Sequence, residues 1–133
     1  MLPTGKRLLI VDDEADITSG LKLGLEQRGM DVTVFNDPFE ALAELESGRG
    51  YDLVITDIRL PSMSGYELYR QIRKRDGDTP IVVLTASDIY PNEFEETYPD
   101  FKPRAMLKKP TTIAELAARV HQILDESDAA EAN

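Results

Sequence analysis

The chain has 133 residues and a mass of 14.9 kDa, which is the size of one domain. Its 15 basic and 25 acidic residues leave a formal net charge of -10, which argues against a nucleic-acid or anionic-membrane surface on this domain. The lack of cysteine excludes disulfides, thiolate zinc sites and thiol catalysis, and the single histidine excludes a multi-histidine metal site.

Apolar runs of strand length alternate with segments of helical periodicity from the N-terminus onward. The run 8–11 predicts a first strand, and the segment 15–28 carries apolar residues at every fourth position, which predicts a helix with one buried face. A second strand is expected at 32–35. Asp37 and Pro38 then open a helix, because aspartate accepts hydrogen bonds from unpaired backbone amides and proline suits the first helical position.

The second half of the chain continues this alternation. Three more strands are predicted, at 53–56, 81–84 and, more weakly, 105–107. Ser64 and Thr112 each stand three residues before a glutamate, which is the spacing of a capping box and predicts a helix start at both places. The chain from Asp125 onward is polar and is expected to fray.

The strands are apolar throughout, which indicates burial on both faces and therefore a parallel sheet covered by helices. The alternation of strand and helix implies right-handed crossovers. No linker rich in glycine or serine divides the chain, so we predict one domain over 1–133, with a core at about 6–125 and a polar tail at 126–133. No apolar run has the length of a transmembrane helix and no signal-peptide core precedes the first strand, so we expect a cytoplasmic protein.

The segment 88–103 breaks the alternation. It contains three prolines and four aromatic residues, and at most about two helical turns fit between its prolines. Tyr90, Phe94 and Tyr98 recur at every fourth position. This stripe could bind a partner, or it could cover the sheet in place of a full helix, which is the reading we favour.

Polar side chains follow the predicted strands at the edge where functional groups of a parallel sheet gather. In chain order, these residues are Asp12, Asp13, Asp57, Thr85 and Lys109. Clustered carboxylates would repel one another unless a cation lies between them, and oxygen ligands without histidine or cysteine favour Mg²⁺ over zinc. Taken alone, Asp12 and Asp13 could simply cap the following helix. The joint position of all these residues at strand ends indicates a site.

At this point the chain resembles the receiver domain of bacterial and archaeal response regulators, over about residues 6–125. The matching segments are LIVDDE at 9–14, DIRLPSMSG at 57–65, LTA at 84–86 and KP at 109–110. The resemblance implies a doubly wound α/β fold of the flavodoxin-like class, with a five-stranded parallel sheet in the order 2-1-3-4-5.

The resemblance also implies a function. Asp57 would accept a phosphoryl group from a sensor histidine kinase or a histidine phosphotransfer protein. The domain would then be a signalling switch and not an enzyme, apart from self-catalysed transfer and loss of this group. Asp13, Asp57 and the backbone carbonyl of Arg59 would ligate Mg²⁺, and Asp12 would act largely through water.

Two further roles and two departures follow from the same resemblance. Thr85 would hydrogen-bond the phosphoryl group and Lys109 would pair with it, whereas Lys108 is less suited because the family's lysine stands immediately before the proline. The family usually has an aromatic ring where this chain has Met106, so a ring movement cannot carry the switch. The interval from Thr85 to Lys109 is longer than usual, so the fourth helix, which would fall in 88–103, is expected to be short, displaced or missing.

Other function classes fit the sequence less well. An aspartate-nucleophile phosphohydrolase would want a second aspartate at the position of Arg59, and a flavodoxin-like electron carrier would want a glycine-rich phosphate loop where 12–14 is acidic. A receiver-like interaction module that is never phosphorylated is a further alternative. The expected partners are the kinase or phosphotransfer protein and a downstream protein target or output domain, without nucleic acid or membrane. The chain is expected to be a stand-alone regulator or a receiver cut from a larger protein.

Overall fold

The computed structural model describes residues 5–60, 62–75, 77–85, 100, 102–109 and 111–132, with the backbone alone for 127–132. The elements in chain order are β1 (Arg7–Val11), α1 (Ala15–Glu26), β2 (Asp31–Phe35), α2 (Pro38–Glu46), β3 (Leu53–Asp57), α3 (Gly65–Arg75), β4 (Ile81–Thr85), β5 (Ala105–Lys108) and α5 (Ile113–Ala132). The expected short fourth helix and the stripe of Tyr90, Phe94 and Tyr98 lie outside the described residues.

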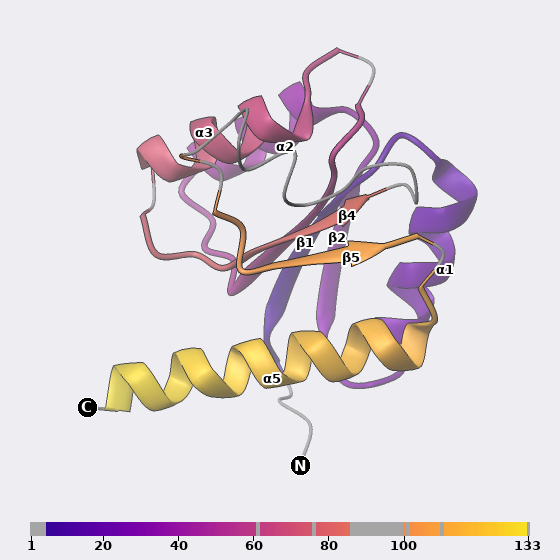
Figure 1. Ribbon diagram of the computed structural model, residues 1–133, viewed down its shortest axis with the longest axis vertical. Helices are drawn as coiled ribbons and strands as arrows, with labels where there is room; N and C mark the ends of the chain where they lie inside the picture. The colour runs from indigo at the N-terminus through magenta and orange to yellow at the C-terminus, as the bar shows by residue number, and fades with distance from the viewer. Residues whose placement is uncertain are drawn as a thin grey trace.

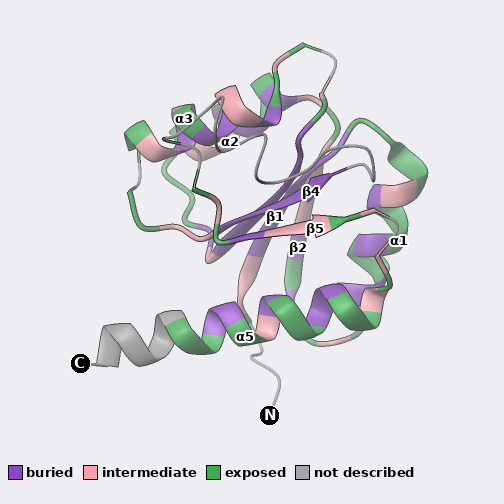
Figure 2. Cartoon of the chain, viewed as in Figure 1, coloured by how far each residue is buried: buried purple, intermediate pink, exposed green. Residues whose placement is uncertain are grey.

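The five strands form one sheet in the order β2-β1-β3-β4-β5, and every neighbouring pair is parallel. This confirms the predicted α/β fold and strand order. Helices α2 and α3 cover one face of the sheet, and α1 and α5 cover the other (Figure 1). The central strands β3 and β4 are buried along their whole length, as parallel strands between two helical layers must be (Figure 2).

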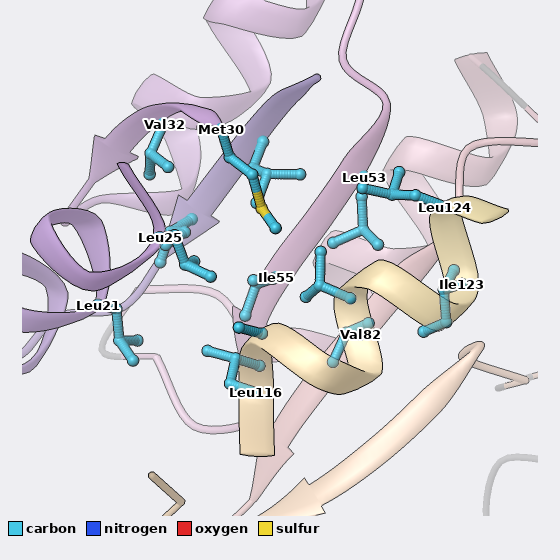
Figure 3. Close-up of a cluster of buried hydrophobic side chains, with 14 of the residues drawn as sticks. Leu21, Leu25, Met30, Val32, Leu53, Ile55, Val82, Leu116, Ile123 and Leu124 are labelled. Carbon is cyan, nitrogen blue, oxygen red and sulfur yellow. The ribbon is translucent and has the colours of Figure 1, made fainter. Parts of the chain in front are cut away.

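The two faces of the sheet carry separate hydrophobic clusters. Leu8 and Ile10 of β1 belong to the cluster beneath α1 and α5, part of which Figure 3 shows. Leu9 and Val11 belong to the cluster beneath α2 and α3. Successive strand residues point to opposite faces, so four consecutive apolar residues were needed to supply both clusters.

The predicted helix starts are confirmed. At the start of α2, Asp37 Oδ1 accepts a hydrogen bond of 2.8 Å from the Phe39 amide, and Pro38 is the first helical residue. The hydroxyls of Ser64 and Thr112 accept hydrogen bonds from the backbone amides three residues further on, at 3.1 and 3.0 Å. Each bond satisfies an amide that has no partner inside its helix.

The expectation of a frayed tail from Asp125 is wrong for the backbone, because α5 continues to Ala132. Two contacts hold this part of the helix. His121 Nε2 lies 3.0 Å from Asp125 Oδ2 one turn later, and Arg104 forms an ion pair with Glu126. The final residues are mostly alanine and glutamate, which favour a helix. Within the described ranges, no helix has the length and apolar character needed to cross a membrane.

Candidate functional site

The carboxyl ends of four strands meet at one edge of the sheet and bring the predicted site residues together. Asp57 is the last residue of β3 and Thr85 is the last residue of β4, while Asp12 and Lys109 directly follow β1 and β5. Backbone hydrogen bonds continue past the strands, since the Lys109 amide donates to the Thr85 carbonyl at 2.7 Å. The strand pairing therefore sets where these side chains leave the sheet.

Lys109 joins the two buried aspartates. Its Nζ donates to Asp57 Oδ2 at 2.6 Å and to Asp12 Oδ2 at 2.9 Å, and it lies 3.9 Å from Glu14 Oε1. The side chains of Asp12 and Asp57 are only 1% and 9% exposed. Burial alone lowers the pKa of Lys109, but the hydrogen bonds and charges of the two aspartates outweigh it, so the pKa is raised. Lys109 is therefore a cation at neutral pH.

Four carboxylates gather at this edge of the sheet, and three of them lie within 4 Å of the Lys109 ammonium group. Asp12, Asp13, Glu14 and Asp57 each offer an oxygen atom, and these atoms all lie within 4.8 Å of one another. Asp12 and Asp57 are buried, whereas Asp13 and Glu14 are exposed, so the cluster opens to solvent on one side. An all-oxygen donor set with surplus negative charge suits a hard divalent cation such as Mg²⁺.

The second carboxylate oxygen of Asp12 binds the backbone at the start of α1. Its Oδ1 accepts a 3.0 Å hydrogen bond from the Glu14 amide at the start of α1. Glu14 is the N-cap residue of this helix, and its own side chain makes no capping bond. The capping role considered for Asp12 therefore describes one of its oxygens, while the other oxygen belongs to the site with Lys109.

The backbone that follows Asp57 is tightly packed. Asp57 Oδ1 accepts a 3.0 Å hydrogen bond from the Arg59 amide, and the Gly65 amide donates to the Ile58 carbonyl at 2.9 Å. A Cβ atom on Gly65 would lie 2.4 Å from the Asp57 carbonyl oxygen and 2.7 Å from the Ile58 Cα. Only glycine allows α3 to begin this close to the acidic residue, a role that the sequence analysis did not assign to Gly65.

The sequence analysis also missed Asn36, which directly follows β2. Its Nδ2 donates to the Asp12 carbonyl at 2.7 Å and to Thr18 Oγ1 at 3.3 Å, so it ties the end of β2 to β1 and α1. Asn36 is a polar residue after a strand, like the residues that were identified. The same criterion, applied to the second strand, would have found it.

The remaining residues that the sequence analysis discussed lie in β4 and β5. Thr85 is completely buried at the end of β4. Lys108, the last residue of β5, is exposed, whereas the next residue, Lys109, turns to the aspartates. Met106 is half-buried and packs against the cluster beneath α2 and α3.

Comparison with known proteins gives a consistent result. Residues 8–121 match the family model of the response regulator receiver domain. The chain is 39% identical over 120 residues to the uncharacterized transcriptional regulatory protein YkoG of Bacillus subtilis, covering 90% of this chain and 51% of that protein. It is 36% identical over 126 residues to the alkaline phosphatase synthesis transcriptional regulatory protein PhoP of the same organism, covering 94% and 51%. The chain thus spans about half the length of these relatives.

Solved structures show the same fold. A CheY-like response regulator receiver domain protein from Methanospirillum hungatei superimposes with a TM-score of 0.84 at 28% identity. The superposition covers 95% of this chain and 98% of that one. The sheet order and the helical layers described above are therefore those of this fold.

Proposed function

Because the chain belongs to the response regulator receiver domain family, we propose that Asp57 accepts a phosphoryl group from a sensor histidine kinase or a histidine phosphotransfer protein. Receiver domains are the phosphoacceptor switches of two-component signalling, and their role is regulatory. The observation that carries the proposal for Asp57 is its buried carboxylate, which lies 2.6 Å from the Lys109 ammonium group inside an acidic cluster.

The proposed transfer is a nucleophilic step. An Asp57 oxygen forms a bond to phosphorus while the phosphorus–nitrogen bond of the donor histidine breaks, and the bonding electrons stay on the imidazole. Negative charge is spread over the three outer oxygens of the group in flight. Lys109, whose Nζ lies 2.6 Å from Asp57 Oδ2, is proposed to stabilise this charge, and the Thr85 hydroxyl is proposed to hydrogen-bond the transferred group.

Receiver domains bind Mg²⁺ at an acidic pocket, and this chain has an acidic cluster at the corresponding edge of its sheet. We propose that Asp13, Asp57 and the Arg59 carbonyl would hold the ion directly, with Asp12 acting largely through water. When bound, the ion supplies the positive charge that lets a dianionic group approach several carboxylates. The exposed position of Asp13 supports this assignment, because it leaves a ligand facing the open side.

The partner that reads the switch is proposed to be a protein. The relatives YkoG and PhoP are named as transcriptional regulatory proteins and are about twice as long as the matched region. An output domain of the same polypeptide, or a separate downstream protein, would therefore receive the signal. The proposed site of action is the cytoplasm, where the donor histidine proteins present their phosphoryl groups.

The test uses acetyl phosphate as a small phosphodonor and intact mass as the readout. With Mg²⁺, the protein should gain one phosphoryl group, and a chelator should prevent the gain. Asp57→Asn should abolish labelling, and Asp13→Ala should weaken it sharply by removing a metal ligand. Asp16→Ala, at an exposed position of α1 outside the cluster, is the matched control and should label normally. Unchanged labelling of Asp57→Asn would refute the assignment.

A further inference from the structure

Helix α3 carries a concentration of positive charge that is unusual for this acidic protein. Four of the chain's 15 basic residues lie within 70–75, although the net charge of the chain is -10. Arg75 is compensated by an ion pair with Glu46 of α2. Arg70, Arg73 and Lys74, together with Lys102, whose backbone carbonyl lies next to α3, form a surface that we call the α3 basic face. Helix α3 lies in the outer layer on the side of the sheet opposite α5 (Figure 1).

Aromatic rings and a backbone carbonyl hold the arginines of this face in place. The Arg70 guanidinium carbon lies 5.9 Å from the centre of the Tyr66 ring, and that of Arg73 lies 5.2 Å from the centre of the Tyr69 ring. Arg73 Nη1 also donates to the Thr79 carbonyl at 2.7 Å. Side chains that are already ordered lose less conformational freedom when they bind a partner.

A carboxylate already lies against this face. Asp100 Oδ1 accepts a 2.6 Å hydrogen bond from the Tyr66 hydroxyl, and its Oδ2 lies 3.7 Å from Arg70 Nε. Beside it is a shallow groove of about 390 Å³, lined by Tyr69, Arg70, Arg73, Lys74 and Asp100. Asp100 therefore shows that a carboxylate can bind to the tyrosine and arginine side chains of this face.

Arg70 of this face pairs with two carboxylates, those of Glu67 and Asp100, at 3.8 and 3.7 Å. Lys74 and Lys102 are exposed, and neither has an ion pair within the part of the chain that the structure describes. The Tyr69 hydroxyl donates to the Lys102 carbonyl at 3.3 Å, which keeps the backbone of Lys102 next to α3. Lys74 thus lines the groove, and the backbone of Lys102 lies next to the Tyr69 hydroxyl at its wall.

We propose that the α3 basic face is a docking surface for an acidic segment of a partner protein, whose aspartate and glutamate side chains pair with Lys74 and Lys102. A short acidic segment responds to charges within a Debye length, about 8 Å at physiological salt, so the face attracts it despite the negative charge of the whole domain. A nucleic acid is a longer polyanion and meets the repulsion of the entire acidic surface.

The docking surface is separate from the phosphoacceptor edge. Helix α3 starts at Gly65 against the backbone of Asp57, and the basic residues occupy its opposite end, about 10 Å along the axis at 1.5 Å per residue. The proposal therefore does not depend on phosphorylation of Asp57.

The test is an NMR titration of the full chain with a short oligoglutamate peptide, started at an ionic strength of about 0.15 M, where the Debye length is about 8 Å. We expect amide shifts over 70–75 and at Lys102, and weaker binding as salt is added. The double variant Lys74→Glu with Lys102→Glu should bind about tenfold more weakly, because two ion pairs become repulsive. The matched control is Lys22→Glu with Arg119→Glu, which makes the same change in net charge at exposed positions of α1 and α5. Thermal unfolding of each variant checks that it is folded.

Three outcomes would overturn the proposal. The first is equal affinity of the double variant and its control, and the second is a set of shifts that lies outside the α3 basic face. The third is tighter binding of single-stranded oligothymidylate, or of vesicles of phosphatidylcholine and phosphatidylserine, than of the peptide. That last result would assign the face to a nucleic acid or to a membrane surface.

Discussion

Lys109 is the residue on which the charge balance of the acidic edge depends. It is the partner of two carboxylates that are almost completely buried, and its own side chain is 19% exposed. A buried carboxylate without a partner is costly, because the charge has lost its hydration and has gained nothing in exchange. Lys109 therefore has a structural effect in addition to its proposed part in phosphoryl transfer.

Replacement of Lys109 should have a much larger effect on stability than replacement of its neighbour Lys108. Lys109→Ala should lower the free energy of unfolding without Mg²⁺ by about 1–3 kcal/mol, since it leaves the buried Asp12 and Asp57 carboxylates without their cation. It should also reduce labelling by acetyl phosphate. Lys108→Ala changes an exposed residue and should stay within about 0.5 kcal/mol. Urea unfolding measures both, and a larger effect of the Lys108 change would contradict the position of Lys109 at the end of β5.

Tyr66 provides a pH-dependent test of the contact between α3 and Asp100. The hydrogen bond to the Asp100 carboxylate favours the neutral phenol and raises the Tyr66 pKa. The stabilisation is present while pH stays below the ordinary tyrosine pKa of about 10, and it is lost as pH rises through the raised value. Asp100→Asn should lower the Tyr66 pKa, as followed by NMR of the tyrosine Cζ. Asp31→Asn, at an exposed position of β2, should leave it unchanged.

At the scale of elements, α3 connects the two surfaces identified in this protein. Its first residue, Gly65, packs on the backbone between Asp57 and Ile58, and its last turns carry the α3 basic face. Its buried face, which includes Leu68 and Ile72, packs in the cluster beneath α2 and α3. The position of α3 on the sheet is therefore set at its N-terminal end by backbone contact and along its length by side-chain packing.

A methyl group at Gly65 should disturb this arrangement. Gly65→Ala should lower the free energy of unfolding by about 1–3 kcal/mol and slow labelling of Asp57, because backbone atoms at 2.4 and 2.7 Å cannot move aside as a side chain can. Gly20→Ala is the matched control within α1, where a Cβ meets nothing within 4 Å. It should stabilise the protein by about 0.5–1 kcal/mol, since alanine favours a helix. Equal stability of the two variants in urea would contradict the close approach of α3 to Asp57.

At the scale of the whole molecule, the sheet separates two hydrophobic clusters. Ile123 of α5 lies in the cluster on one face and Ile72 of α3 lies in the cluster on the other, and each residue is 2% exposed. The strands between them contribute alternate side chains to each cluster. The clusters share a sheet but not side chains, so changes in one should not repack the other.

This separation predicts additive stability changes. Ile123→Val and Ile72→Val should each cost about 0.5–1.5 kcal/mol of unfolding free energy, which is the usual effect of one buried methylene. The double variant should show the sum within about 0.5 kcal/mol, because the sites have no shared partners. Guanidinium unfolding of the three variants tests this. A double variant that departs from the sum by more would indicate coupling through the sheet.

The sequence alone determined the parts of this protein that depend on local pattern. The run 8–11 predicts a strand buried on both faces, and Asp37 and Ser64 predict helix starts. Both signals are local, because the periodicity of apolar residues and the capping of backbone amides each involve only a few neighbouring residues. The meeting of Asp12, Asp57, Thr85 and Lys109 was also predictable. Parallel strands place their carboxyl ends at one edge, so residues far apart in the chain share a position relative to the fold.

The tertiary structure decided the contacts that depend on how helices approach the sheet and each other. The need for glycine at position 65, the bond from Asn36 to the Asp12 carbonyl and the Tyr66–Asp100 contact each join residues whose separation is set by packing. The ion pair of Arg104 with Glu126 of α5 likewise joins residues that packing brings together. Sequence pattern shows which face of an element is buried, but the distance between two elements follows from the side chains that fill the space between them.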